Sequence, residues 1–305
     1  MDRPVSVIDL GTNTILMVTG RHQGGKVEIL DDAHVIARLG KGVDAQGLIL
    51  PETMDRVCTY LAQYRDRAQD LGAKRVAAFG TSALRDAANG PQFIDRVRRE
   101  VGIKLVVVPG QDEARLTFRG ARFGLDLPTR YGVLDIGGGS TELAVGSDQA
   151  LELSHSVDVG GVRVTERCFG TLPPSQQEVT AASDFIRQRL QGLTSYPRGV
   201  PLVGVAGTAT TLGAIDSGQI DFKGEQLNGY TLSRSRLHTL ADHLLTLSLE
   251  QIQAIPQIDP KRADIIAAGS LILRLAVDRF DVDGLTISTR GIRYGLLLEV
   301  LAGKR

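Results

Sequence analysis

The chain has 305 residues, of which 42% are hydrophobic and 23% charged. This composition is typical of a folded globular protein and excludes a disordered or collagen-like chain. At ~150 residues per domain, the length predicts two domains. The 35 basic and 35 acidic residues cancel, so no overall charge attracts nucleic acid or an anionic membrane, and we expect neither as a partner.

Targeting and redox features are sparse. The sequence enters a strand-like run at Val5 without a basic and then apolar export segment, and it contains no stretch of ~18 apolar residues. We therefore expect a cytoplasmic protein. Cys58 and Cys168 are isolated from each other in the sequence, which favours free thiols over a disulfide framework or a metal site.

Short apolar runs alternate with longer helical patterns along the chain, which predicts an α/β fold. The predicted strands are residues 5–10, 76–80, 104–108, 131–136, 202–206 and 285–288. Helices are predicted at 51–72 and 91–102, each opened by proline and followed by glycine. A third helix, from Asp259 toward Phe280, is apolar on nearly all sides and is predicted to be buried between layers.

Two turn motifs recur at nearly the same offset. Asp9-Leu-Gly-Thr-Asn-Thr14 is matched 126 residues later by Asp135-Ile-Gly-Gly-Gly-Ser140, and Gly80-Thr is matched 127 residues later by Gly207-Thr. The repeat predicts two related halves, residues 1–124 and 125–305. The second half is longer by about 54 residues within 213–284, which predicts a helical insertion. We expect the last helix to pack back on the first half.

An Asp-x-Gly turn after a strand offers main-chain N–H groups to phosphate oxygens and a carboxylate to a metal ion or water. One such turn is common, but two facing turns predict a phosphate-binding cleft. Glycines let the backbone approach an anion, and hydroxyl groups add donors. The predicted phosphate-binding residues of these turns are Gly11, Thr12, Asn13, Thr14, Gly137, Gly138, Gly139, Ser140 and Thr141.

Competing motifs are absent from the sequence. It has no P-loop, no dinucleotide-binding glycine motif and no HExxH zinc motif. The five histidines are scattered, without a Ser/His/Asp arrangement.

Seven ordered motifs give the chain a family resemblance. They are Ile8-Asp-Leu-Gly-Thr-Asn-Thr14, Arg38-Leu-Gly40, Thr81-Ser-Ala-Leu-Arg-Asp-Ala-Ala-Asn-Gly90, Gln111-Asp-Glu-Ala-Arg115, Asp135-Ile-Gly-Gly-Gly-Ser-Thr-Glu142, Gly207-Thr-Ala-Thr-Thr211 and Arg290-Gly-Ile-Arg-Tyr-Gly295. Over nearly its whole length the sequence resembles the exopolyphosphatase/guanosine pentaphosphate phosphohydrolase (Ppx/GppA) family. This resemblance implies two ribonuclease H-like lobes, of the actin, Hsp70 and sugar kinase type, with the substrate in the interlobe cleft.

The resemblance also implies roles for individual residues. Glu113 matches the catalytic glutamate that orients or deprotonates the attacking water. Asp135 and Glu142 match acidic catalytic positions near a divalent ion, and Asp9 faces them as a third metal candidate. Mg²⁺ is the expected metal, with Mn²⁺ as an alternative. Further phosphate-binding candidates are Ser82, Arg85, Gly207 and Thr208, with Arg38, Arg290 and Arg293 as weaker ones. For Arg85, an ion pair with Asp86 or another acid is the alternative.

The chain also departs from the family pattern. Leu16 occupies a position that is often basic in the family, which puts one phosphate contact of the first lobe in doubt. The sequence ends at Arg305 without the HD-type helical extension of longer members. We therefore expect a preference for short polyphosphates, and association into a homodimer remains a hypothesis.

The predicted function is an exopolyphosphatase that removes terminal phosphate from inorganic polyphosphate. Hydrolysis of guanosine pentaphosphate is the alternative within the family, and these motifs do not separate the two. A nonhydrolytic sensor of polyphosphate or guanosine tetra- and pentaphosphate is a third hypothesis. A kinase of the same superfamily is a fourth, although the sequence shows no acceptor motif.

Overall fold

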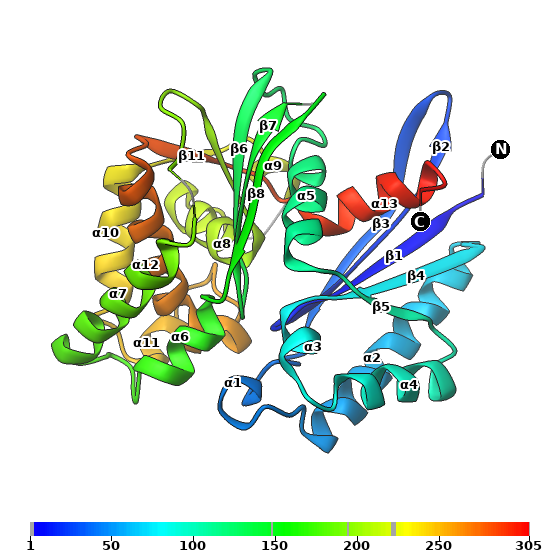
Figure 1. Cartoon of the computed structure of the whole chain (residues 1–305), viewed down its shortest axis with the longest axis horizontal. Helices are drawn as coiled ribbons and strands as arrows, with labels where there is room; N and C mark the ends of the chain where they lie inside the picture. The colour runs from blue at the N-terminus through cyan, green and yellow to red at the C-terminus, as the bar shows by residue number, and fades with distance from the viewer. Residues whose placement is uncertain (1–2, 148, 194, 221–223, 305) are drawn as a thin grey trace.

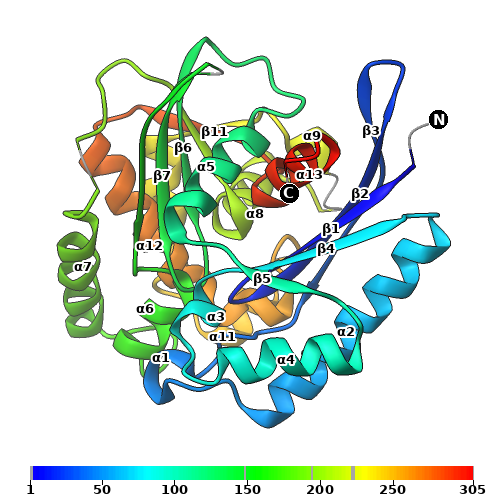
Figure 2. The same cartoon turned by 45° about the vertical axis from the view of Figure 1, so that its right-hand side comes forward.

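The computed structural model describes residues 3–147, 149–193, 195–220 and 224–304. It contains two mixed β-sheets, each flanked by helices, which lie on the two sides of the molecule (Figures 1 and 2). This arrangement confirms the predicted α/β class.

The first sheet has the strand order β3-β2-β1-β4-β5. Its strands are β1 (Val5–Leu10), β2 (Thr14–Gln23), β3 (Lys26–Ile36), β4 (Arg75–Gly80) and β5 (Leu105–Val107). β1, β2 and β3 are antiparallel neighbours, whereas β4 and β5 run parallel to β1. Alternate residues face opposite sides of the sheet. Ile8 and Leu10 pack with helices α2 (Pro51–Asp70) and α4 (Gly90–Glu100), and Val7 packs with α13 (Ile292–Leu301).

The second sheet repeats this order and adds one edge strand, giving β10-β11-β9-β6-β7-β8. Its strands are β6 (Arg130–Ile136), β7 (Thr141–Ser147), β8 (Leu151–Val157), β9 (Leu202–Val205), β10 (Thr231–Ser233) and β11 (Gly284–Ile287). β6, β7 and β8 are antiparallel, and β9 and β11 continue the sheet in parallel with β6. The internal repeat inferred from the two turn motifs is therefore present in the topology.

The helices complete the two layers. They are α1 (Val43–Gln46), α2 (Pro51–Asp70), α3 (Ser82–Asp86), α4 (Gly90–Glu100), α5 (Gly110–Ala121), α6 (Gly161–Cys168), α7 (Gln176–Leu190), α8 (Ala206–Ser217), α9 (Gly224–Leu227), α10 (Arg234–Leu244), α11 (Leu249–Gln253), the 3₁₀ turn η1 (Pro260–Arg262), α12 (Ala263–Phe280) and α13 (Ile292–Leu301). Local signals set several of their ends. Pro51 is the first residue of α2, and Ser175 with Glu178 forms a capping box at α7.

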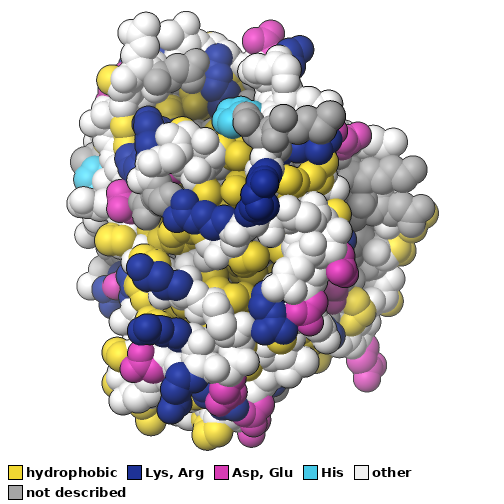
Figure 3. Space-filling view, turned by 90° about the vertical axis from the view of Figure 1, so that its right-hand side faces the viewer, with side chains coloured by type: hydrophobic (Ala, Val, Ile, Leu, Met, Phe, Trp, Pro, Cys, Tyr) yellow, Lys and Arg dark blue, Asp and Glu magenta, His cyan; other side chains and the backbone are white. Residues whose placement is uncertain are grey.

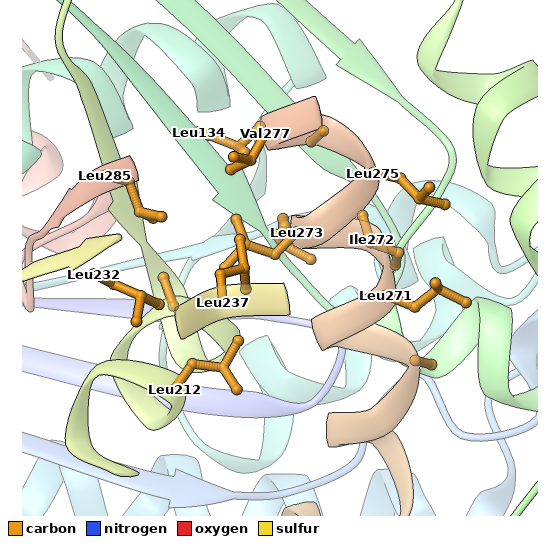
Figure 4. Packing of buried hydrophobic residues seen from close by; sticks show 14 of the residues in the cluster. Leu134, Leu212, Leu232, Leu237, Leu271, Ile272, Leu273, Leu275, Val277 and Leu285 are labelled. Carbon is orange, nitrogen blue, oxygen red and sulfur yellow. The ribbon is translucent and has the colours of Figure 1, made fainter. Parts of the chain in front are cut away.

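Helix α12 is the centre of the second lobe's helical layer. Its buried residues pack against the second sheet and against α8 and α10 on one side, where Figure 4 shows Leu273 beside Leu237 of α10. Leu271 and Leu275 lie on the other side of the helix. The predicted burial of this helix is correct, and its first turn is the 3₁₀ segment η1. Because α12 is fixed by this core, the residues just before it are held in place at the cleft.

Helix α13 follows the last strand of the second sheet but packs against β1 and β2 of the first sheet, beside α5 (Figure 1). The two helices cross at glycines: a Cβ at Gly120 would lie 2.0 Å from the carbonyl oxygen of Gly291, and one at Gly295 would lie 2.0 Å from that of Leu116. Glu299 on α13 accepts hydrogen bonds from Arg115 and Arg119 on α5. The boundary between residues 124 and 125 stays a prediction.

Within the described residues, no helix is both long enough and apolar enough to cross a membrane. Figure 3 shows the face of the first lobe, where basic side chains are interspersed with hydrophobic and acidic ones.

Candidate active site

Two turns of the same geometry lie at the ends of β1 and β6. In the first, the amide of Gly11 donates to the carbonyl oxygen of Thr14 at 3.0 Å; in the second, Gly137 donates to Ser140 at 3.0 Å. The next segment of each lobe supports its turn from behind: Gly40 donates to the carbonyl of Thr12. The amides of Val162 and Arg163 donate in the same way to the carbonyl of Gly138.

Several main-chain amides of these turns are free to donate hydrogen bonds to a ligand. Within the described part of the chain, the N–H groups of Thr12, Asn13, Gly138 and Gly139 donate no hydrogen bond to a protein acceptor. The two turns face each other, because a Cβ at Gly138 would lie 3.0 Å from the side chain of Thr12. Opposed amide donors in this arrangement are suited to phosphate oxygens.

Four carboxylates lie beside the turns. Asp9 belongs to β1, Glu113 to the first turns of α5, Asp135 to β6 and Glu142 to β7. All four are buried, with exposed fractions of 5%, 8%, 9% and 2%. Asp135 and Glu142 are direct cross-strand partners, and Leu16 takes the equivalent place opposite Asp9 in the first lobe.

Burial raises the pKa of each of these carboxyl groups because it disfavours the charged form. The charge of Glu113 adds to this effect at Asp9, Asp135 and Glu142, and the pKa of Asp135 rises to about 7. The hydroxyl of Ser156 opposes the rise by donating to Glu142 Oε1 at 2.7 Å. A concentration of buried negative charge of this kind favours a cation.

Arg85 is the basic side chain paired with Glu113. Its Nη1 donates to Glu113 Oε2 at 2.7 Å and to the carbonyl oxygen of Val108 at 2.8 Å. Burial raises the pKa of Glu113, and Arg85 lowers it in opposition. The structure thus pairs Arg85 with an acid, which is the alternative left open from the sequence, although that acid is Glu113 rather than Asp86. Direct binding of phosphate by Arg85 stays a prediction.

The donor set fits a divalent metal only in part. Among the described residues, no group of three or more His, Cys, Asp and Glu side chains is placed to hold a metal ion. Asp9, Asp135 and Glu142 therefore do not form a preassembled three-ligand site. Asp9 Oδ1, however, is buried and has no hydrogen-bond partner in the described part of the chain. Mg²⁺ is commonly held by one or two carboxylates together with substrate phosphates, and these residues fit that mode.

Gly207 and Thr208 lie at the start of α8, beside Arg262 and Gly269. Arg262 Nη1 lies only 1.2 Å from the place that a Cβ at Gly207 would occupy, so the guanidinium rests directly on this turn. Arg262 is half-buried, burial lowers its pKa, and within the described residues its side chain makes no hydrogen bond or ion pair. The sequence analysis did not identify Arg262 as a candidate. Its position just before an apolar helix was the feature of the sequence that could have indicated it.

The three weaker arginine candidates are engaged elsewhere. Arg38 pairs with Asp264 across the lobes. Arg290 donates to the carbonyl of Phe123 at 3.1 Å, and Arg293 pairs with Asp32 at 2.9 Å. Arg290 and Arg293 are thus engaged with other partners, although the charge of Arg293 acts on Asp9 and opposes the rise in the pKa of that carboxyl group. Ser82 does lie there, because its Oγ would be 2.4 Å from a Cβ at Gly139.

Two small cavities lie between the lobes. One, of about 100 Å³, is lined by Asn13, Arg38, Lys41, Val162, Thr165, Glu166, Asp264 and Ile265. The other, of about 10 Å³, lies between the phosphate turns and includes Thr12, Ser82, Gly138, Gly139 and Arg163 in its lining. The lobes are thus closed on each other at the turns.

Two similar sheets, whose Asp-x-Gly turns face each other, define a two-lobed protein of the ribonuclease H-like class. The profile of the Ppx/GppA phosphatase family matches residues 18–303, and the chain belongs to this family. The protein is accordingly a phosphoanhydride hydrolase, the enzyme class expected from its sequence.

Relatives and solved structures agree with this assignment. The chain is 35% identical to exopolyphosphatase 2 of Mycobacterium tuberculosis, over 98% of each sequence. It is 28% identical to the guanosine-5'-triphosphate,3'-diphosphate pyrophosphatase of Vibrio vulnificus, over 98% of this chain and 60% of that protein. The crystal structure of an exopolyphosphatase from Cytophaga hutchinsonii superposes with a TM-score of 0.90 at 26% identity, covering 99% of both chains.

Proposed function

We propose that this protein is an exopolyphosphatase that hydrolyses the terminal phosphoanhydride bond of inorganic polyphosphate. The observation that carries the proposal is the meeting of two sets of free amide donors with four buried carboxylates, at one point between the lobes. The amides are suited to successive phosphates of a chain, and the carboxylates are suited to water and a cation. A cytoplasmic location also remains a prediction.

In this proposal Glu113 is the catalytic base. Its carboxylate stands at the first turns of α5, held by Arg85, and would orient the water and accept its proton as it attacks the terminal phosphorus in line. Asp9, Asp135 and Glu142 would hold Mg²⁺, or Mn²⁺, in combination with substrate oxygens. The ion would supply neutralisation of the charge on the phosphoryl oxygens. Glu142 is oriented by the hydroxyl of Ser156.

The remaining phosphate-binding residues follow the cleft. Gly11 to Thr14 and Gly137 to Thr141 would bind the terminal phosphates, with Ser82 from α3 between them. Gly207 and Thr208, with the guanidinium of Arg262, would bind more distant phosphates. A helix N-terminus favours anions, and so does an arginine that forms no ion pair among the described residues.

Polyphosphate is favoured over guanosine pentaphosphate by one observation. The exopolyphosphatase relative is the more similar, at 35% identity against 28% for the guanosine-5'-triphosphate,3'-diphosphate pyrophosphatase. Leu16, opposite Asp9, offers no charge to a phosphate of either substrate.

The test is orthophosphate release from short polyphosphate, long polyphosphate, guanosine pentaphosphate and ATP, with Mg²⁺, with Mn²⁺ and with EDTA. Wild type is compared with Glu113→Gln and with Asp112→Asn, which changes a neighbouring half-buried acid of the same helix. We expect metal-dependent release from polyphosphate that collapses only in Glu113→Gln. Faster release from guanosine pentaphosphate would reject polyphosphate as the substrate. Polyphosphate binding without release from any substrate would identify a sensor instead.

A further inference from the structure

Helix α6 of the second lobe contacts the first lobe through charged residues. Arg163 and Arg167 both pair with Asp44 of α1, and Arg163 also pairs with Asp86 of α3. Glu166 Oε1 accepts a hydrogen bond from the amide of Gly42 at 2.8 Å. Figures 1 and 2 both show α6 beside α1 at the same edge of the molecule.

Arg163 joins this contact to the phosphate turn. Its Nε donates to the carbonyl oxygen of Gly139 at 2.8 Å, while Nη1 donates to Asp44 and Nη2 to Asp86. The side chain is only 11% exposed. One guanidinium thus holds the turn of its own lobe and two carboxylates of the other.

The space beside this guanidinium is too small for phosphate. The cavity between the turns measures about 10 Å³, whereas a single water molecule requires ~10–15 Å³. Phosphate can therefore enter only when the turn at Gly138 and Gly139 moves away from Thr12 and Ser82.

Opening of this kind changes the partners of Arg163 unequally. Asp44 and Asp86 belong to the first lobe, so their ion pairs with Arg163 break when the lobes separate. The bond from Nε to Gly139 lies within the second lobe and persists. The two Nη groups are then left at the phosphate turn as a planar pair of donors, which is the geometry that binds phosphate oxygens.

We propose that Arg163 is a phosphate-binding residue that exchanges partners during turnover, and that Asp44 and Asp86 are internal competitors of phosphate for it. This inference rests on the proposed function, because it places the anion at the same turns. Closure on the two carboxylates expels phosphate, and entering phosphate replaces the carboxylates. The ion pairs are therefore an autoinhibitory contact.

The exchange predicts effects of opposite sign on the two sides of one ion pair. Removal of the arginine weakens phosphate binding. Removal of the competing carboxylates strengthens it, although both changes break the same interlobe contact. A purely structural ion pair would give effects of the same sign.

The experiment measures the Kd of inorganic phosphate by calorimetry at constant ionic strength for the full chain. We expect Arg163→Gln to weaken binding about tenfold, the loss of a charge-assisted pair of hydrogen bonds. The double variant Asp44→Asn, Asp86→Asn should tighten binding several-fold. Glu166→Gln is the charge control, because it removes a negative charge from α6 but keeps an oxygen that can accept from Gly42, and among the described residues Glu166 forms no ion pair with Arg163. Small-angle scattering without phosphate should show a larger radius of gyration for the double variant.

Any other outcome would overturn the exchange of partners at Arg163, the proposed function, or both. Weaker binding by the double variant, or an unchanged radius of gyration, would overturn the exchange. Equal tightening by Glu166→Gln would assign the effect to net charge and would overturn it as well. The expected order of phosphate affinities without hydrolysis of any substrate would overturn the proposed function alone. A wild-type protein that binds no phosphate would overturn both.

Discussion

The crossing of α5 and α13 makes Gly295→Ala a sharp test of the packing. The added Cβ would lie 2.0 Å from the carbonyl oxygen of Leu116 and 2.7 Å from its carbonyl carbon, and contacts under 3.0 Å are essentially never seen for real Cβ atoms. Both clashing atoms are backbone atoms, so no side chain can rotate away. Helix α13 must therefore move from α5 by about 1 Å.

The expected cost follows from two opposing terms. Overpacking a well-packed site costs ~1–3 kcal/mol, and a backbone clash belongs at the upper end of this range. Alanine recovers ~1 kcal/mol through its higher helix propensity. We expect a net loss of ~2 kcal/mol in the free energy of unfolding. Because α5 also carries Glu113, displacement of α5 should lower kcat.

The assay is urea unfolding followed by orthophosphate release from polyphosphate. Gly291→Ala is the control, because it adds a methyl group at the start of the same helix with no heavy atom within 4 Å. The urea midpoint should fall at constant m for Gly295→Ala and by clearly less for the control. Equal midpoints for the two variants would refute the claim that the close crossing requires glycine.

Three further predictions concern the site. Arg85→Gln removes the cation held 2.7 Å from Glu113 and leaves that carboxylate buried and unpaired. We expect kcat to fall about 100-fold, equivalent to ~3 kcal/mol, and the acidic limb of the pH profile of kcat to move to higher pH. An unmoved limb would contradict the pairing. Gly139→Ala places a Cβ 2.4 Å from Ser82 Oγ, which should lower kcat/KM by displacing the turn that is proposed to bind phosphate. The loss should be smaller in a Ser82→Ala background, and an equal loss there would argue against the contact. The pKa of Asp135 is raised from 3.8 to about 7, so between these pH values the folded protein keeps a proton that the unfolded chain releases. In EDTA, the free energy of unfolding should therefore fall as the pH rises from about 4 to 7, by at most ~4 kcal/mol. Asp135→Asn should flatten this slope in urea titrations, and Mg²⁺ should restore stability at pH 8.

The sequence predicted the fold through its most regular features. The buried strands β1, β4, β6, β9 and β11 were found because they are continuous apolar runs, and their turn motifs revealed the repeat. β2, β3, β7, β8 and β10 were missed. β3 and β8 are half exposed along most of their length, so their side chains lack the apolar continuity by which the other strands were found.

The candidate site was predicted residue by residue only where a motif carried it. The four acids and the two turns are gathered as expected, but the pairing of Arg85 with Glu113 and the placement of Arg262 on Gly207 depend on distant segments. Arg163 belongs to none of the motifs, and its three partners come from both lobes. Contacts of this kind are set by how the lobes pack, which no local pattern encodes.

The repeated topology would by itself give a cleft with two equivalent ends. The cross-strand partner of Asp135 is Glu142, whereas the corresponding partner of Asp9 is Leu16. The residues opposite Asp9 and Asp135 therefore make the two sides of the repeated fold chemically different. A linear substrate that enters between the lobes meets the pair of carboxylates on only one side, so its two ends, once bound, have different surroundings.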